Sequence, residues 1–173
     1  ALPYLRERVG DSDRLPPAPP AGALAVLPPR PLPERRTCEL VAGAGAAAER
    51  IDALMRAAGR DGVVAVGRGA GAEIEGCRRL AERYGARLAV SRPQVEAGRA
   101  TRAELVGASG ETVAPRTYLA VGISGALPHL VGMADSGTVV AVNHVRSARI
   151  FEYADLGVTA DAGEMIAALL ALG

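Results

Sequence analysis

Short apolar runs bounded by glycine or polar turn residues limit most strongly how this chain folds. "GVVAVG" (62–67), "TYLAVG" (117–122) and "GTVVAVN" (137–143) are rich in β-branched residues and carry almost no polar side chains. Strands without polar alternation are typical of parallel sheets, which are covered on both faces. These three runs therefore predict the buried strands of a parallel β-sheet.

Weaker strand patterns and amphipathic helical patterns fill the stretches between these runs. The predicted further strands are 37–42, 86–90 and 156–161, and the predicted helices are 47–59, 72–85 and the C-terminal segment from Ala162. Strands that alternate with helices indicate βαβ units, right-handed crossovers and an α/β fold with helices on both faces of a mainly parallel sheet. The pattern does not give the order of the strands.

The N-terminal part of the chain has a different composition. Residues 1–36 hold nine of the twelve prolines, and proline both removes an amide donor and favours an extended residue before it. We expect residues 1–36 to be a proline-rich linker or arm and residues 37–173 to be one globular domain. Because the chain begins with Ala1 and not Met, we also expect a processed product or a fragment.

Composition excludes several classes of function. The chain has 173 residues, 49% of them hydrophobic, and a net charge of +1, so it can bury a core but offers no basic stripe for nucleic acid. All twenty basic residues are arginine, which indicates a GC-rich bacterial genome. No apolar run approaches the roughly 18 to 20 residues that cross a membrane, so we expect a cytoplasmic protein.

The reactive residue types form no recognisable catalytic or metal-binding group. Cys38 and Cys77 lack metal-ligand spacing and are expected to be reduced thiols. No nucleophile with a base, no pair of carboxylates and no metal-ligand cluster emerges. A carrier or binding protein is therefore favoured over an enzyme with its own substrate.

Glycines follow two of the predicted strands, at the sheet edge where α/β proteins bind ligands. Gly67, Gly69 and Gly71 permit close backbone approach, and Arg68 between them suits a phosphate, although the spacing is not GxGxxG. A tight turn without any ligand explains these glycines equally well.

The second glycine turn, "VGISGALPH", surrounds Ser124. We expect Ser124 to cap the next helix, Pro128 to lie in its first turn, and His129 to lie near an anion held by the free amides there. On position alone, a histidine that only satisfies a backbone carbonyl explains His129 at least as well. Asn143 and Asp161 end two other strands and suit a base and a ribose hydroxyl, or else cap helices, for which Asp161 is well placed.

Three segments together resemble a known family. "SRPQVEAG" (91–98), "VAPRTYLAVGISGALPHLVGM" (113–133) and "VVAVNHVRSARIFEYADLGVTAD" (139–161) look like the FAD-binding domain of the electron transfer flavoprotein alpha subunit. The resemblance implies a Rossmann-like, doubly wound domain that holds FAD. It also implies a beta-subunit-like partner, and electron transfer from acyl-CoA and other dehydrogenases to a quinone reductase.

The resemblance also assigns roles by motif position. It implies that Arg68 and Ser91 meet the FAD phosphates, that Arg92 lies against the isoalloxazine ring, and that His129 lies near the pyrimidine carbonyl. The full set of implied cofactor-binding residues is Arg68, Ser91, Arg92, Gly107, Ser109, Gly122, Ser124, Gly125, Ala126, His129, Asn143 and Asp161. A cation and a hydrogen-bond donor beside the ring would stabilise the negative charge of a reduced flavin.

The chain departs from the family pattern near the expected flavin. "GASGE" (107–111) replaces GQTGK, so Ala108 loses an amide, Glu111 replaces a lysine and Ser109 keeps only a hydroxyl. Pro128 replaces a glutamine, and His144 and Val145 replace the usual residues after Asn143. We expect FAD binding to survive, but the "GASGE" and Pro128 changes motivate an alternative: a diverged nucleotide-binding or oligomerisation module whose cleft is empty or takes NAD or an adenine nucleotide. A homo-oligomer is a further expected partner state.

Overall fold

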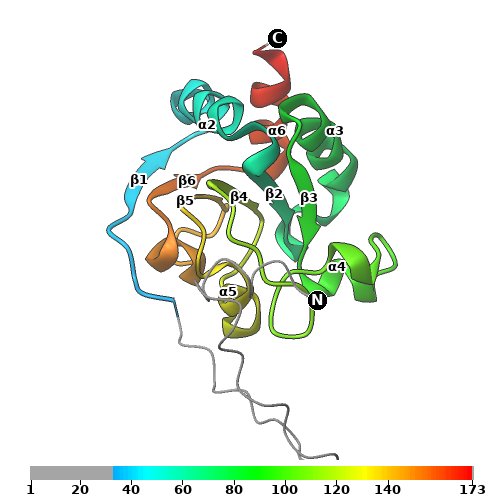
Figure 1. The fold of residues 1–173 in the computed structure, drawn as a ribbon. Helices are drawn as coiled ribbons and strands as arrows, with labels where there is room; N and C mark the ends of the chain where they lie inside the picture. Colours follow the sequence, from blue (N-terminus) through cyan, green and yellow to red (C-terminus); the bar gives the residue numbers. More distant parts are fainter. Residues whose placement is uncertain (1–32, 173) are drawn as a thin grey trace, which may run out of the picture. The chain divides into compact units, whose positions relative to one another are not determined.

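The computed structural model describes residues 33–172, which contain a six-stranded, wholly parallel sheet in the order β1-β6-β5-β4-β2-β3 (Figure 1). The strands are β1 (Glu39–Ala42), β2 (Gly62–Val66), β3 (Arg87–Val90), β4 (Thr117–Val121), β5 (Thr138–Val142) and β6 (Leu156–Thr159). The α/β fold and all six predicted strands are confirmed. The predicted arm, residues 1–36, lies outside the described residues except for its last four.

The central strands are apolar on both faces because both faces are covered. Every residue of β2 and β4 is buried, and Leu119 of β4 pairs in register with Val64 of β2 and Val140 of β5. Successive side chains of a strand point to opposite faces, so Leu119 and its neighbour Tyr118 belong to two separate apolar clusters.

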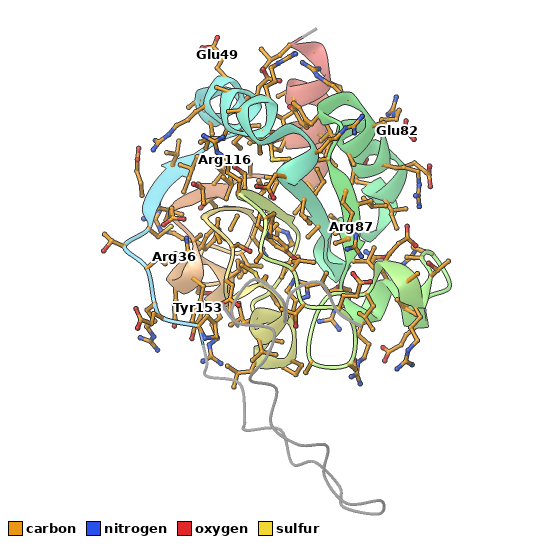
Figure 2. All side chains as sticks on the ribbon, viewed as in Figure 1. Arg36, Glu49, Glu82, Arg87, Arg116 and Tyr153 are labelled. Carbon is orange, nitrogen blue, oxygen red and sulfur yellow. The ribbon has the colours of Figure 1, made fainter. Side chains whose placement is uncertain are left out.

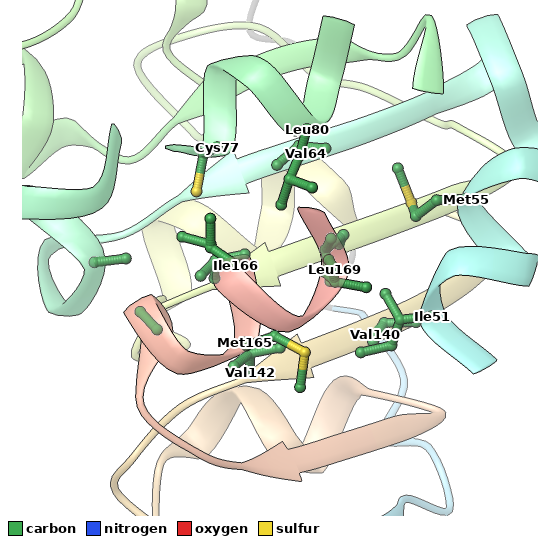
Figure 3. Close-up of a cluster of buried hydrophobic side chains, with 14 of the residues drawn as sticks. Ile51, Met55, Val64, Cys77, Leu80, Val140, Val142, Met165, Ile166 and Leu169 are labelled. Carbon is green, nitrogen blue, oxygen red and sulfur yellow. The ribbon is translucent and has the colours of Figure 1, made fainter. Parts of the chain in front are cut away.

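Three helices cover one face of the sheet: α2 (Gly45–Ala58), α3 (Ile74–Tyr84) and α6 (Ala162–Ala171). Figure 3 shows their apolar side chains meeting those of the central strands, and the fully buried members include Ile51, Met55, Leu80, Met165 and Leu169. Each fully buried large side chain stabilises the fold by roughly 1.5–3 kcal/mol.

The opposite face is covered by shorter elements. The helix α5 (Leu127–Met133) and the 3-10 helix η5 (Arg149–Tyr153) pack there. The sheet presents alanines to them in β2, β4 and β5, together with the wholly buried ring of Tyr118. The small side chains leave room for the turns to approach the sheet.

The predicted helices are confirmed, with shifted ends. The first begins at Gly45 instead of 47, and Gly59 follows it with φ +54°, a conformation that favours glycine. The second begins at Ile74 because the glycine-rich residues before it form a 3-10 helix, η3 (Arg68–Glu73). A short helix not predicted from the sequence, α4 (Arg92–Glu96), follows β3.

The strand order puts a topological switch at β2. The consecutive strands β3 and β4 lie on opposite sides of β2, so the connections after β2 and β4 diverge from the carboxyl edge of the sheet. In open α/β sheets this is where a crevice opens and ligands bind. A ligand site is therefore expected among the loops that follow β2 and β4.

Arg36 attaches the segment before β1 to the sheet (Figure 2). Its guanidinium donates to the carbonyl oxygens of Ser136 (2.6 Å) and Gly137 and pairs with the carboxylate of Asp155 at 2.6 Å. Asp155 in turn accepts from the amide of Val139 at 2.7 Å. One arginine thus joins the start of the described chain to the loops beside β5.

Two remaining sequence predictions concern thiols and membranes. Cys38 and Cys77 are free, and burial raises the pKa of Cys77 to about 12, so it stays protonated. Among residues 33–172 no helix has the length and apolar character needed to cross a membrane.

Candidate functional site

A cavity of about 760 Å³ lies at the carboxyl edge of the sheet, next to the switch at β2. It is formed by residues that follow β2, β3, β4 and β5 and by the loop between α4 and β4. Its volume falls in the range of small-molecule sites, about 300–1,000 Å³. The residues of the predicted set that line it are Arg68, Ser91, Arg92, Gly107, Ser109, Gly122, Ser124, Ala126, His129 and Asn143.

Two glycine turns in contact form one side of the cavity. The amide of Gly67 donates to the carbonyl oxygen of Val121 at 2.8 Å, and that of Gly69 donates to Gly122 at 3.0 Å. A Cβ at Gly67 would lie 2.2 Å from the oxygen of Gly122, and Gly122 itself has φ +66°. Only glycine permits this approach, so the turns need their glycines for backbone packing.

Within residues 33–172, two buried polar atoms of residues that line the cavity have no hydrogen-bond partner. Ser91 and His129 line it and are 8% and 7% exposed, yet Ser91 Oγ and His129 Nδ1 make no hydrogen bond. Leaving a buried donor or acceptor unpaired costs about 1–3 kcal/mol. A bound polar molecule would remove that cost, so these two residues fit a site for a ligand with hydrogen-bonding groups.

The imidazole of His129 is neutral at neutral pH. Burial lowers the pKa of His129 to about 4, and the backbone of Val106 offsets this only in part, without hydrogen-bond geometry to Nδ1. The other nitrogen, Nε2, lies 2.9 Å from the hydroxyl oxygen of the fully buried Tyr118. At neutral pH, His129 is therefore a neutral hydrogen-bonding group and not a cation.

Positive charge at the cavity comes from arginines. Within residues 33–172, Arg68 is exposed and makes no ion pair, and Arg92 donates to Ser109 Oγ at 2.6 Å. Glu111, an acidic residue close in sequence to Gly107 and Ser109, is not part of the lining and forms an ion pair with Arg87 of β3. The cavity rim thus favours an anionic ligand.

The prediction that Ser124 caps a helix is wrong. Gly125, with φ +85°, and Ala126 separate Ser124 from α5, whose N-cap is Ala126 without a side-chain hydrogen bond. Ser124 instead accepts a bond from the amide of Ile150 through its carbonyl oxygen, at 3.1 Å. Pro128 does lie in the first turn of α5, as predicted.

Asn143 lines the cavity but its side chain already has partners. Its amide nitrogen donates to the carbonyl oxygen of Ile123 at 2.9 Å, and its oxygen accepts from the amide of Val145 at 2.9 Å. It therefore ties the turn after β4 to the turn after β5.

Two residues of the predicted set do not line the cavity. Gly125 lies against the backbone of Arg149 and Ile150. Asp161 is the N-cap of α6 and accepts from the amides of Gly163 and Glu164 at 2.8 and 3.2 Å. The alternative of a helix cap for Asp161 is therefore confirmed.

Sequence reasoning missed the apolar wall of the cavity. Leu105 and Val106 line it because they continue beside β3, where the amide of Val106 donates to the carbonyl oxygen of Val90 at 3.0 Å. The apolar pair directly before Gly107 is the signal that could have revealed this. Further apolar residues of the lining are Pro93, Ile123, Ala126, Pro128 and Val145. Among residues 33–172 no group of histidine, cysteine or acidic side chains is arranged to hold a metal ion.

Comparisons with known proteins show that part of this chain is similar in sequence to one family. Residues 57–134 match the family described as "Electron transfer flavoprotein FAD-binding domain". Three relatives named "Electron transfer flavoprotein subunit alpha" are similar. The protein of Thermoanaerobacterium thermosaccharolyticum is 42% identical over 112 residues, 64% of this chain and 34% of its own. The protein of Bradyrhizobium diazoefficiens is 47% identical over 92 residues, 53% of this chain and 29% of its own. The protein of Pseudomonas aeruginosa is 49% identical over 82 residues, 47% of this chain and 26% of its own. The matched parts thus cover about a third or less of these relatives.

Proposed function

We propose that residues 37–173 bind FAD in the cavity and act as an electron carrier, because residues 57–134 match the family of electron transfer flavoprotein FAD-binding domains. The observation that carries this proposal is the pair of buried, unpartnered atoms Ser91 Oγ and His129 Nδ1 in a cavity rimmed by Arg68 and Arg92. FAD supplies polar groups for both atoms and negative charge for the arginines.

Different residues of the cavity are suited to different parts of FAD. Arg68 and Ser91, next to the glycine turn at Gly67 and Gly69, are suited to phosphate oxygens. Asn143 lies in the lining, holds the two neighbouring turns together and is proposed to meet the adenosine end of FAD. The family resemblance implies the same role for Asp161, but its side chain caps α6 and does not line the cavity, so it is left out of the proposed site. Bound FAD would supply one- and two-electron transfer.

The part of the cavity that we assign to the flavin ring contains the guanidinium of Arg92, the hydroxyl of Ser109 and the neutral imidazole of His129. Arg92 holds Ser109 by donating to its hydroxyl oxygen, which leaves the hydroxyl hydrogen free to donate to the ring. His129, in α5, is uncharged at neutral pH and supplies a hydrogen-bonding group to the ring. Leu105 and Val106 exclude water from one side of the ring.

The partners are part of the same proposal. We propose a beta-subunit-like protein that completes the flavin site, flavin dehydrogenases such as acyl-CoA dehydrogenases as electron donors, and a quinone reductase as acceptor. The names of the relatives, which describe them as alpha subunits of electron transfer flavoproteins, support a second subunit and a role in electron transfer.

Ligand titrations test the proposal. The purified chain is titrated with FAD, FMN, NAD and ADP, and thermal shift and visible absorbance are recorded, because a ligand that binds only the folded state raises the melting temperature. We expect FAD to give the largest shift and a perturbed flavin spectrum. Equal shifts with ADP and FAD would favour the diverged module that reads no flavin ring, and no shift with any of the four would refute nucleotide binding.

An arginine pair supplies the matched control. Arg68→Gln removes the free cation from the cavity, and Arg79→Gln removes an exposed arginine of α3 that is not part of the lining. We expect only Arg68→Gln to weaken FAD binding. Weakening by both variants to the same extent would assign the effect to the net charge of the protein.

A further inference from the structure

Among the residues that the structure describes, the hydroxyl of Tyr118 has one hydrogen-bond partner, His129. Tyr118 is fully buried in the apolar cluster beneath α5, and its hydroxyl oxygen makes its hydrogen bond to His129 Nε2 at 2.9 Å. The two rings meet edge to face, with centroids 6.3 Å apart. Burial raises the pKa of Tyr118 above its ordinary value, so the phenol keeps its proton at neutral pH. A phenol proton buried here can go only to Nε2, because leaving it unpaired is costly.

This donation determines which nitrogen of His129 carries the proton. A neutral imidazole has one N–H and one bare nitrogen, and a nitrogen that accepts a hydrogen bond must be the bare one. If Nε2 accepts from Tyr118, the ring proton is on Nδ1. That is the same buried atom that lacks a protein partner at the cavity.

We infer that Tyr118 is a positioning residue that fixes His129 in the Nδ1–H tautomer, so that His129 presents a hydrogen-bond donor to an acceptor oxygen of the bound ligand. This inference rests on the proposed function for the identity of the ligand, the carbonyl oxygen of a flavin. The tautomer itself depends only on the protein.

Nitrogen NMR reads the tautomer directly. The chain holds two histidines, so a long-range proton–nitrogen correlation spectrum of protein with ¹⁵N-labelled histidine contains two ring systems, and His144→Gln assigns them. At about pH 7, we expect His129 to show a protonated Nδ1 and a bare Nε2. A protonated Nε2 in the unsubstituted protein would overturn the inference without any variant.

A matched pair of tyrosine variants tests the role of the hydroxyl. Tyr118→Phe keeps the ring and removes only the oxygen, and Tyr153→Phe makes the same change at another buried tyrosine of the same cluster, whose hydroxyl accepts from Arg149. We expect Tyr118→Phe to give a mixture of both His129 tautomers and Tyr153→Phe to leave the spectrum unchanged. An unchanged tautomer in Tyr118→Phe would overturn the inference.

FAD titration of the same variants separates the two proposals. The loss of one oriented hydrogen bond predicts an FAD Kd about three- to tenfold higher for Tyr118→Phe, with Tyr153→Phe close to the unsubstituted protein. If FAD does not bind at all, the proposed function fails while the tautomer is still measured. If FAD binds and Tyr118→Phe changes the tautomer without weakening binding, the donor role toward the ligand is refuted.

Discussion

The amide of Gly69 donates a hydrogen bond over 3.0 Å to the carbonyl oxygen of Gly122, and this bond joins the turn after β2 to the turn after β4. A Cβ at the nearby Gly67 would lie 2.2 Å from the same oxygen. The cavity therefore depends on a contact between two backbones, and side chains at these positions would push the turns apart.

Gly67→Ala should destabilise the protein and weaken FAD binding. We expect the free energy of unfolding to fall by about 1–3 kcal/mol, the range of overpacking, because the clash is with backbone atoms. Chemical denaturation and FAD titration measure the two effects. Gly45→Ala is the control, since a Cβ there meets nothing within 4 Å and Gly45 begins α2. A Gly67→Ala protein as stable as the unsubstituted one would contradict the tight contact.

Arg92→Gln should lower the reduction potential of bound flavin. A positive charge near the ring stabilises the reduced, more negative form, and two unit charges 4 Å apart in water interact by about 1 kcal/mol, which corresponds to tens of millivolts. Equilibration with a reference dye measures the potential. Arg79→Gln, on the exposed side of α3, should leave it unchanged. A potential unaffected by Arg92→Gln would place this arginine away from the ring.

Asp161→Ala should lower stability more than it affects FAD binding. The side chain caps α6 through two amides, and the loss of such a cap costs about 1 kcal/mol. Asp161→Asn keeps a capping oxygen and removes the charge, so it should retain most of the stability. Denaturation curves and FAD titrations of both variants decide the outcome. A large loss of FAD affinity in both variants would instead assign the carboxylate to the ligand.

Asp52 should make stability fall in acid. Burial opposes its ionisation, but hydrogen bonds from Arg56 (2.7 Å) and Tyr84 (3.0 Å), with the charges of Arg56 and Arg83, hold the pKa of Asp52 below its usual value. The stabilisation is present above the unfolded-state pKa of about 3.9 and is lost as the pH falls through the lower folded-state pKa.

Asp52→Asn isolates this contribution. At neutral pH we expect it to lower the free energy of unfolding by about 1–3 kcal/mol, because Arg83 and Tyr84 of α3 lose a charged partner on α2. Below the folded-state pKa of Asp52, the two proteins should converge. Glu49→Gln, a change at an exposed residue of the same helix (Figure 2), is the control. A difference that stays constant from neutral to acid pH would contradict the ionic contribution.

The strands and helices were predictable because buried elements show a characteristic spacing of apolar residues along the sequence. Val64 and Leu119 sit in wholly apolar runs, and these became the central strands β2 and β4. Gly85 ended its helix in the left-handed conformation expected of such a C-cap. The order of the strands was not predictable, because the apolar runs carry no information about which run pairs with which.

The sequence predicted at which edge of the sheet the site lies and which residue types line it. It did not predict the hydrogen bonds between them. Ser124 was expected to cap a helix, but the positive φ of Gly125 moves the helix start past Ala126, and spacing alone does not reveal a backbone conformation. The contact between Tyr118 and His129 was also hidden. The two residues are eleven positions apart on a strand and a helix, and only their packing shows that they touch.

Arg36 has a consequence for protein engineering. Its guanidinium engages two carbonyl oxygens and the carboxylate of Asp155, and its own amide donates to the carbonyl oxygen of Glu152 at 2.9 Å. A version trimmed to begin at Thr37 would leave these acceptors without their arginine partner and would remove one attachment of the segment before β1, although β1 itself stays paired with β6. Anyone grafting this module onto another protein should therefore place the junction upstream of Arg36.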